Sequence, residues 1–229
     1  MRISSSGKSP MCADVLRLHH HILTTRTEGP GLRAGIWVQG CPNHCDGCMA
    51  QDTWSFSDGY EMTVGALANE ILAVPCLEGA TFAGGEPFCQ AGTLAHLARL
   101  LRRAGLSIIV FTGYTLAQLR EMSAPSVTAL LDRTDVLIDG SYIKERACQN
   151  IPLVGSSNQR YHFLTDRYTS LTDMWTDGKN KIEIRILPDG SISANGMLPE
   201  TLLGSLLRSA TEGKAATKGA KDCETLFPL

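Results

Sequence analysis

Short hydrophobic runs alternate with amphipathic helical patterns along most of this chain. Each of four runs (AGIWV, ATFA, SIIVF and VLI) is short, rich in β-branched or small apolar residues, and predicts a buried strand. Strands that alternate with helical segments at this spacing are typical of parallel βα units. The predicted strands are Ala34 to Val38, Ala80 to Ala83, Ser107 to Phe111 and Val136 to Ile138.

The helices between these strands have recognisable ends. Thr63 is a suitable N-cap for the first helix, and Pro75 follows its end. The second helix turns three arginines outward and stops at Gly105, and a shorter helix begins near Thr115. The faces predicted to be buried are Val64, Leu67, Ala68 and Ile71 in the first helix and Leu94, Leu97, Ala98 and Leu101 in the second.

The chain has 229 residues, and a complete eight-stranded βα barrel needs about 250. The sequence therefore predicts an α/β fold, an incomplete TIM-like barrel of about six parallel strands. Val15 to Leu23 is expected to add a strand before it. Alternation in Lys181 to Leu187, followed by the turn Pro188 to Gly190, predicts a C-terminal hairpin before a helical tail that begins with a helix at 202–207. The expected organisation is an N-terminal extension (1–14), a barrel domain (15–208) and a mobile tail (209–229).

Composition narrows the class of protein. Hydrophobic residues make up 43% and charged residues 19%, enough for a packed core and too little charge for global disorder. A net charge of −2 argues against nucleic acid as the main ligand. No stretch approaches the roughly 20 apolar residues of a membrane-spanning helix, and no apolar signal region follows the N-terminus. We expect a soluble, cytoplasmic protein without a membrane partner.

The eight cysteines fall into one cluster and five scattered residues. Cys41, Cys45 and Cys48 form a C-x3-C-x2-C array directly after a predicted strand. In a reducing compartment such a cluster indicates metal ligation rather than disulfides. The scattered cysteines, including Cys89 at a helix start, are expected to be small buried residues or free thiols.

Three thiolates on one loop can hold three corners of an iron–sulfur cube and leave the fourth iron open to a small molecule. A structural zinc site is the alternative, but zinc normally takes four protein ligands. His44 is the nearest candidate for a fourth, and its neighbour Cys45 already occupies the loop. The array therefore favours a [4Fe-4S] cluster over zinc or unligated cysteines.

A second motif supports this interpretation independently. Phe82 to Pro87 (FAGGEP) ends the second predicted strand, and with the cysteine array it resembles the radical S-adenosylmethionine (SAM) superfamily. Further segments resemble the activating enzymes of anaerobic ribonucleotide reductase and the related activase of pyruvate formate-lyase. They are Glu28 to Arg33, Thr112 to Thr115, Asp139 to Gly140 and Gly155 to Arg160.

The resemblance implies a role for each matching residue. Cys41, Cys45 and Cys48 would bind the cluster, and Gly47, Cys48 and Met49 would border the adenosyl group of SAM. Gly84, Gly85 and Glu86 would meet its methionine end. Asp139 and Ser141 lie in a stretch that contacts SAM in the pyruvate formate-lyase activase, although Ser141 replaces a lysine there. It implies no catalytic residue beyond the cluster.

The resemblance also implies a reaction. An electron donor such as flavodoxin or ferredoxin would reduce the cluster, and SAM would be cleaved to methionine and a 5′-deoxyadenosyl radical that abstracts hydrogen. The substrate would be a glycyl-radical enzyme, most like an anaerobic ribonucleotide reductase. Two alternatives stay open: a radical SAM enzyme that modifies a small molecule or a ribosomal peptide, and a non-catalytic zinc- or cluster-binding module.

Several polar residues have a structural interpretation beside a functional one. Asp139 could cap its turn, and Arg33 could pair with Glu28 instead of binding an anion. The run Ser156 to Arg160 could bind the SAM carboxylate or cap its own loop. The three histidines at 19–21 are interpreted as strand residues.

Overall fold

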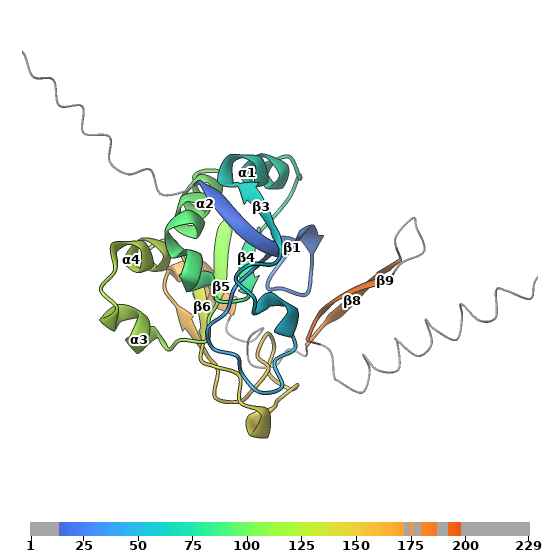
Figure 1. The fold of residues 1–229 in the computed structure, drawn as a ribbon. Coiled ribbons are helices and arrows are strands. Elements are labelled where there is room, and N and C mark those ends of the chain that lie inside the picture. The colour runs from blue at the N-terminus through green and yellow to red at the C-terminus, as the bar shows by residue number, and fades with distance from the viewer. Residues whose placement is uncertain (1–13, 172–174, 176–179, 187–191, 198–229) are drawn as a thin grey trace, which may run out of the picture. The chain divides into compact units, whose positions relative to one another are not determined.

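The computed structural model describes residues 14–171, 175, 180–186 and 192–197. The predicted turn at 188–190, the helix at 202–207, the tail at 209–229 and all of the N-terminal extension except residue 14 lie outside these residues. The described part is a mixed α/β fold built on one seven-stranded sheet (Figure 1).

The strand order of this sheet is β3-β1-β2-β4-β5-β6-β7. A separate antiparallel hairpin, β8–β9, confirms the predicted hairpin strands. The strands are β1 (Val15–Thr25), β2 (Arg33–Val38), β3 (Tyr60–Thr63), β4 (Gly79–Gly84), β5 (Ser107–Phe111), β6 (Val136–Asp139), β7 (Arg160–Phe163), β8 (Ile182–Ile186) and β9 (Ile192–Gly196).

The prediction of about six parallel strands is wrong for the described residues. Only β2, β4, β5 and β6 run parallel, while β1, β3 and β7 pair antiparallel with their neighbours. A parallel connection needs a crossover of a dozen or more residues, usually a helix. The connection at 26–32 is too short for one, and the connection at 140–159 contains only a short 3-10 helix, so both lead to antiparallel pairing.

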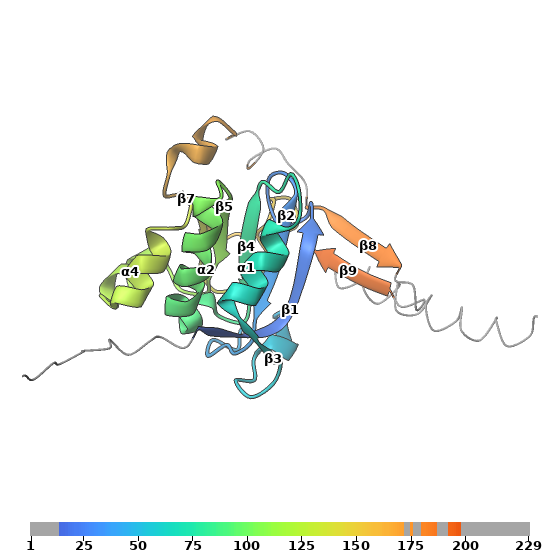
Figure 2. The same ribbon diagram turned by 90° about the horizontal axis from the view of Figure 1, so that it is seen from above.

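The α-helices lie together on one face of the sheet (Figure 2). As predicted, Thr63 caps α1, since its hydroxyl accepts a hydrogen bond from the Ala66 N–H at 3.2 Å. The described helices are α1 (Val64–Leu72), α2 (Ala91–Arg103), α3 (Leu116–Glu121) and α4 (Pro125–Leu131). The 3-10 helices are η1 (Gln51–Thr53), η2 (Pro87–Gln90), η3 (Lys144–Arg146) and η4 (Asp166–Leu171).

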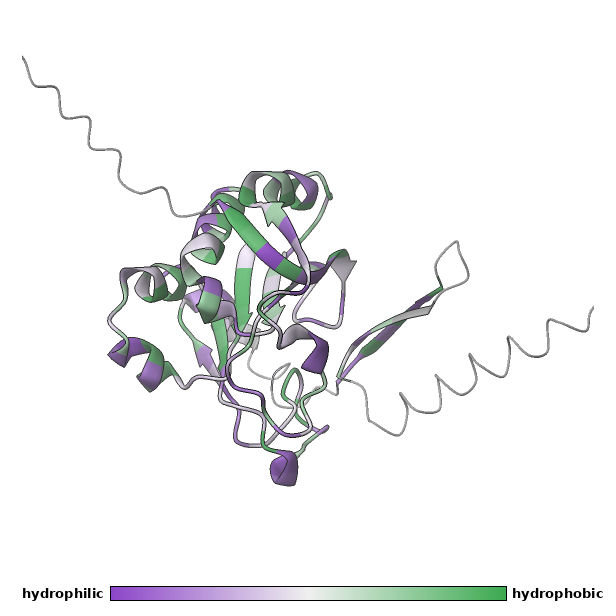
Figure 3. Cartoon of the chain, viewed as in Figure 1, coloured by the Kyte–Doolittle hydropathy of each residue, from purple (hydrophilic) through white to green (hydrophobic). Residues whose placement is uncertain are grey.

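Each face of the sheet has its own hydrophobic core. The larger core joins the predicted faces of α1 and α2 to residues such as Ile36 and Phe82 on the helix side. On the other face, which we call the inner face, Leu153, Val154 and Trp175 cover strands β5 to β7. The central strands are mostly hydrophobic in Figure 3, as expected for strands buried on both faces. The short helix η3 is hydrophilic in the same view.

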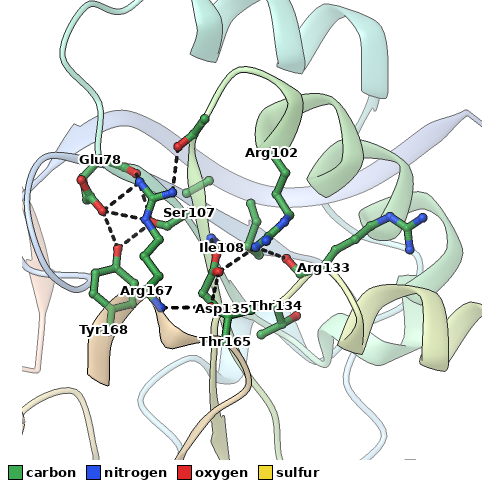
Figure 4. Close-up of polar contacts among 12 residues, drawn as sticks. Glu78, Arg102, Ser107, Ile108, Arg133, Thr134, Asp135, Thr165, Arg167 and Tyr168 are labelled. Carbon is green, nitrogen blue, oxygen red and sulfur yellow. Dashed lines mark hydrogen bonds and ion pairs between the residues drawn. The ribbon is translucent and has the colours of Figure 1, made fainter. Parts of the chain in front are cut away.

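Hydrogen bonds and ion pairs of charged side chains connect the amino ends of the parallel strands (Figure 4). Asp135, just before β6, accepts hydrogen bonds from the Ile108 N–H at 2.8 Å and the Thr165 hydroxyl at 2.7 Å, and its other partner is Arg102 at 2.7 Å. Glu78, before β4, accepts a hydrogen bond from the Tyr168 hydroxyl at 2.9 Å. Polar groups at this end of parallel strands serve stability, which leaves the carboxyl ends for chemistry. Within the described residues, no helix is both long and apolar enough to cross a bilayer.

Candidate functional site

The cysteine array lies on a loop at the carboxyl end of β2. Hydrogen bonds close the base of this loop: the Gly40 N–H donates to the Thr53 carbonyl at 2.8 Å, and the Cys41 N–H donates to the Trp54 carbonyl at 3.1 Å. The Gln39 amide donates to two further carbonyls beyond the array. The loop therefore projects from the sheet edge with both of its ends fixed.

All three cysteines of the array are free thiols and are partly exposed. Burial raises the pKa of the Cys41 thiol, and the backbone N–H groups of Asn43 and His44 oppose that shift. The Ala50 N–H donates to the Cys48 sulfur at 3.4 Å. Backbone N–H groups directed at cysteine sulfurs suit thiolates that ligate an iron–sulfur cluster, whose properties such hydrogen bonds tune.

The arrangement fits a cluster better than a single metal ion. Each thiolate of a cubic cluster binds a different iron, so three cysteines suffice for it, whereas a zinc ion normally takes four protein ligands. His44, the nearest candidate for a fourth zinc ligand, stacks on Trp54 with ring centroids 4.7 Å apart. His44 and Gly47 have φ values of 45° and 73°, so left-handed residues reverse the loop between its cysteines.

Glu86 joins the cysteine loop to the neighbouring strand end. Its buried carboxylate accepts hydrogen bonds from the Phe88 N–H (3.0 Å), the Thr112 hydroxyl (2.9 Å) and the Gly113 N–H (2.9 Å). The Asn43 amide adds a fourth at 3.3 Å. Burial raises the pKa of Glu86 and these four donors oppose the shift. The contacts of Glu86 are thus with protein groups, and its predicted contact with SAM stays a prediction.

The two glycines before Glu86 allow close contact between backbone segments. A Cβ on Gly85 would lie 2.3 Å from the Gly40 carbonyl oxygen, and Gly84 has a φ of 97°. The Gly85 N–H donates to Val38 and the Glu86 N–H to Gly40, each at 2.8 Å. The motif predicts that these glycines contact SAM. The structure shows a second reason for glycine at these positions, because the two backbone segments already lie this close without a ligand.

Asp139 and Ser141 border a cavity of about 720 Å³ beside α3, together with Arg120 and Arg160. The buried Asp139 carboxylate accepts a hydrogen bond from the Leu116 N–H at 2.6 Å and lies 2.9 Å from the His162 ring nitrogen. Asp139 therefore accepts the first N–H of α3, whose N-cap is Thr115. The Ser141 hydroxyl donates to the Gly113 carbonyl at 2.8 Å, so it adjoins the Glu86 contacts.

The other predicted polar residues have structural partners. Arg33 is fully buried and donates to the Thr81 hydroxyl at 2.9 Å and the Ala80 carbonyl at 2.8 Å. Arg33 therefore has a structural role and does not bind an anion. It has this role through the hydrogen bonds just given and not through the suggested pairing with Glu28. The Ser156 hydroxyl accepts from the Ile143 N–H at 3.2 Å, which supports the loop-capping alternative. The histidines at 19–21 are strand residues of β1, as predicted.

The prediction is confirmed for one scattered cysteine and wrong for another. Cys76 is a free thiol, one of the two predicted states, whereas Cys89 was expected to be buried and is an exposed free thiol in the 3-10 helix η2. Asn43, Thr112 and Gly113 were missed as positioning residues. The only signal for them was their place inside the motifs already quoted, since hydrogen bonds to a distant carboxylate leave no pattern in the sequence.

Comparison with known proteins identifies the family. The profile of the family described as "4Fe-4S single cluster domain" matches residues 27–162. The anaerobic ribonucleoside-triphosphate reductase-activating protein of Vibrio cholerae is 34% identical over 160 residues, which cover 66% of this chain and 99% of that protein. The chain belongs to this family of activating proteins.

Other members and relatives give the same result. The activating protein of the same name from Escherichia coli is 28% identical over 159 residues, covering 65% of this chain and 99% of that protein. The pyruvate formate-lyase-activating enzyme of Clostridium pasteurianum is 31% identical over 130 residues, 54% of this chain and 55% of the enzyme. Among solved structures, QueE from Escherichia coli matches 44% of this chain and 53% of its own with 21% identity and a TM-score of 0.37, too low for an argument about fold.

Membership of the activating-protein family confirms the radical SAM resemblance found in the sequence. It also confirms the predicted cofactors, a [4Fe-4S] cluster and SAM, at the level of the family. The non-catalytic zinc module is therefore no longer needed to explain the cysteine array.

Proposed function

We propose that this chain activates an anaerobic ribonucleoside-triphosphate reductase by abstracting a hydrogen atom from a glycine of that partner. The observation that supports this most strongly is the match to 99% of the Vibrio cholerae activating protein. Three free thiols on one fixed loop at the end of β2 supply the chemistry that such an activity needs.

In this proposal Cys41, Cys45 and Cys48 hold the cluster. Gly47 and Met49 border the adenosyl group of SAM, and the exposed Met49 side chain is free to cover it. When bound, the reduced cluster and SAM supply a 5′-deoxyadenosyl radical. The remaining task of the protein is to orient both groups and to exclude water.

The second half of the proposed SAM site comes from three neighbouring strand ends. Gly84 ends β4, and Gly85 and Glu86 follow it. Asp139 ends β6, and Ser141 lies two residues further on. Glu86 holds the cysteine loop against the β5–α3 turn through Asn43 and Gly113. We propose that the sheet curves as a partial barrel, which would bring these carboxyl ends to one rim.

The proposal also includes an electron donor. A low-potential one-electron carrier such as flavodoxin or ferredoxin would reduce the cluster. Free thiols and an oxygen-sensitive cluster suit a reducing compartment, so we propose the cytoplasm as the place of this reaction.

Electron paramagnetic resonance tests the proposal directly. The anaerobically reconstituted protein, SAM and a reductant are incubated with the anaerobic reductase of the source organism. We expect the doublet of a glycyl radical on the reductase, and no doublet when Cys45 is replaced by alanine in the activating protein. A wild-type protein that cleaves SAM but yields no doublet goes against the proposed partner.

One observation favours a second candidate function. The match to the Vibrio cholerae protein takes up only 66% of this chain, so about a third of it has no counterpart there. A radical SAM enzyme that modifies a small molecule or a peptide could use that additional part for its substrate. Turnover of such a substrate, with no glycyl radical on the reductase, would favour this candidate.

A further inference from the structure

The cavity of about 720 Å³ beside α3 has no residue of the cysteine array among the described residues that line it. Its lining comes from three places: α3 with the turn before it, the segment after β6, and the strand β7 with the residues before it. Small-molecule sites typically have volumes of about 300 to 1,000 Å³. The cavity is therefore large enough for a small organic ligand.

The cavity lies on the helix side of the sheet. Ile138 of β6 and Tyr161 of β7 are paired in the antiparallel register, and both pack in the core of the inner face. Asp139 and Arg160 form the next pair, so their side chains point to the opposite face because side chains alternate along a strand. Both border the cavity there. The cavity is thus across the sheet from the inner-face core.

Two arginine side chains on the border of the cavity are available to a ligand. Arg120 belongs to the last turn of α3 and Arg160 begins β7, and both are exposed. Neither guanidinium has a hydrogen-bond or ion-pair partner among the described residues. The carboxylate of Asp139 is buried and already occupied by the Leu116 N–H and the His162 ring. The planar guanidinium groups therefore favour an anion, and their geometry suits phosphate.

An amide oxygen of the lining also lacks a partner. The Asn158 Nδ2 donates to the Ser141 carbonyl at 2.8 Å, which fixes the orientation of the amide. The Asn158 Oδ1 is buried and accepts no hydrogen bond from the described residues, and such acceptors usually have a partner in the functional state. Apolar side chains make up another part of the lining, namely Leu116, Ala117 and Ile143. The cavity thus offers contacts to an anion, a hydrogen-bond donor and an apolar group.

We propose that this cavity binds a nucleoside phosphate. The phosphate groups would bind Arg120 and Arg160, and the base and sugar would lie against Leu116 and Ile143. A hydroxyl or amino group of the nucleoside would donate to the Asn158 Oδ1. A simple anion would leave the apolar side chains and this oxygen without a partner, and an apolar ligand would leave the two arginines unused. The inference goes beyond the proposed function, which gives neither arginine a role, and does not depend on it.

Binding of ATP to the full, anaerobically reconstituted protein tests the proposal. Titration calorimetry is carried out with ATP, inorganic triphosphate and adenosine, each with and without saturating SAM. The SAM arm is needed because Asp139 and Ser141 border the cavity and also belong to the proposed SAM site. The variants are Arg120→Ala and Arg160→Ala. Arg99→Ala is the matched control, because Arg99 is likewise exposed but lies on α2, outside the cavity.

We expect a single ATP to bind per chain, with the same affinity when SAM is present. Each replacement of a cavity arginine should weaken ATP binding by at least about tenfold, because a charge-assisted hydrogen bond to phosphate is lost. Arg99→Ala should bind ATP like wild type. Inorganic triphosphate should bind more weakly than ATP, and adenosine should not bind measurably at millimolar concentration.

Several results would overturn the proposal. One is the absence of saturable ATP binding. Another is displacement of ATP by SAM, which would assign the cavity to the cofactor site. Unchanged binding in both cavity variants, or an equal loss in Arg99→Ala, would show that ATP does not bind in this cavity. Inorganic triphosphate that binds as tightly as ATP would indicate a simple anion site. The proposed function is tested separately, by the glycyl radical on the reductase.

Discussion

At the scale of single residues, side chains of one type differ widely in their surroundings, as the cysteines of this chain show. The clustered cysteines lie on a loop with N–H groups directed at their sulfurs, whereas Cys76 is exposed at a turn after α1. The motif spacing allowed the sequence to identify the first group. It could not show that Glu86 acts through Asn43 and Gly113, because those contacts depend on how three separate strand ends meet.

Cys45→Ala should abolish iron binding at the array. One corner of the cluster would lose its ligand, and the two remaining thiolates do not hold a cubic cluster. Iron and sulfide analysis after anaerobic reconstitution measures the effect. Cys76→Ser is the matched control and should bind as much iron as wild type, while normal iron content in Cys45→Ala would mean that the site is misplaced.

Glu86→Gln should weaken both the fold and the cysteine loop. The amide has one acceptor oxygen, so donors now bonded to the carboxylate, such as the Gly113 N–H, would face an NH2 group. Loss of hydrogen bonds to a buried acceptor costs about 2 to 3 kcal/mol. Urea unfolding of the metal-free protein measures this loss, and the exposed Glu121→Gln should unfold like wild type. Equal stability of the two variants would show that the Glu86 contacts are not significant.

At the scale of secondary-structure elements, the sequence predicted what periodicity can show. The four parallel strands and the faces of α1 and α2 follow from hydrophobic spacing and are present. Strands β3 and β7 were not predicted, because β3 is an edge strand with an exposed pattern and the residues of β7 are only partly buried. Strand direction was wrong at both sides of the parallel set, since it depends on whether the connection contains a helix.

Gly85→Ala should disturb the contact between the strand ends of β2 and β4. The added methyl group would lie 2.3 Å from the Gly40 carbonyl oxygen, and Gly40 directly precedes Cys41. We therefore expect lower iron loading as well as weaker SAM binding, both measurable on the reconstituted protein by iron analysis and titration.

Gly65→Ala provides the control for this prediction. Gly65 lies in α1 with nothing within 4 Å of an added Cβ, so alanine should raise the free energy of unfolding by about 0.5 to 1 kcal/mol and leave iron loading unchanged. If Gly85→Ala loaded iron equally well, close contact between the two loops would not be required.

At the scale of the whole described molecule, one buried acid links the sheet to the β8–β9 hairpin. Glu28 lies in the β1–β2 connection, and Asn195 of β9 donates hydrogen bonds to Thr25 and Thr27 next to it, at 2.8 and 2.7 Å. Burial raises the pKa of Glu28 from 4.5 to about 7, opposed by hydrogen bonds from Thr27 and Asn195. No sequence pattern indicates this link, because Asn195 and Glu28 are far apart in the chain.

The raised pKa predicts a pH dependence of stability. Between pH 4.5 and about 7 the unfolded chain releases the Glu28 proton while the folded chain keeps it. The free energy of unfolding should therefore fall as the pH rises through this window, by about 3 kcal/mol from this group. In Glu28→Gln the contribution disappears, so the difference in stability between variant and wild type should grow in favour of the variant up to about pH 7. A difference that does not change with pH would contradict the assignment.

We propose above all that three thiolates of one loop hold a cluster with a place for SAM. Quantification of 5′-deoxyadenosine tests it most directly, after wild-type protein with about four irons per chain has been incubated anaerobically with SAM and dithionite. We expect 5′-deoxyadenosine and methionine in equal amounts, both absent from Cys45→Ala. Wild-type protein that carries its full iron and sulfide yet forms no 5′-deoxyadenosine would contradict it.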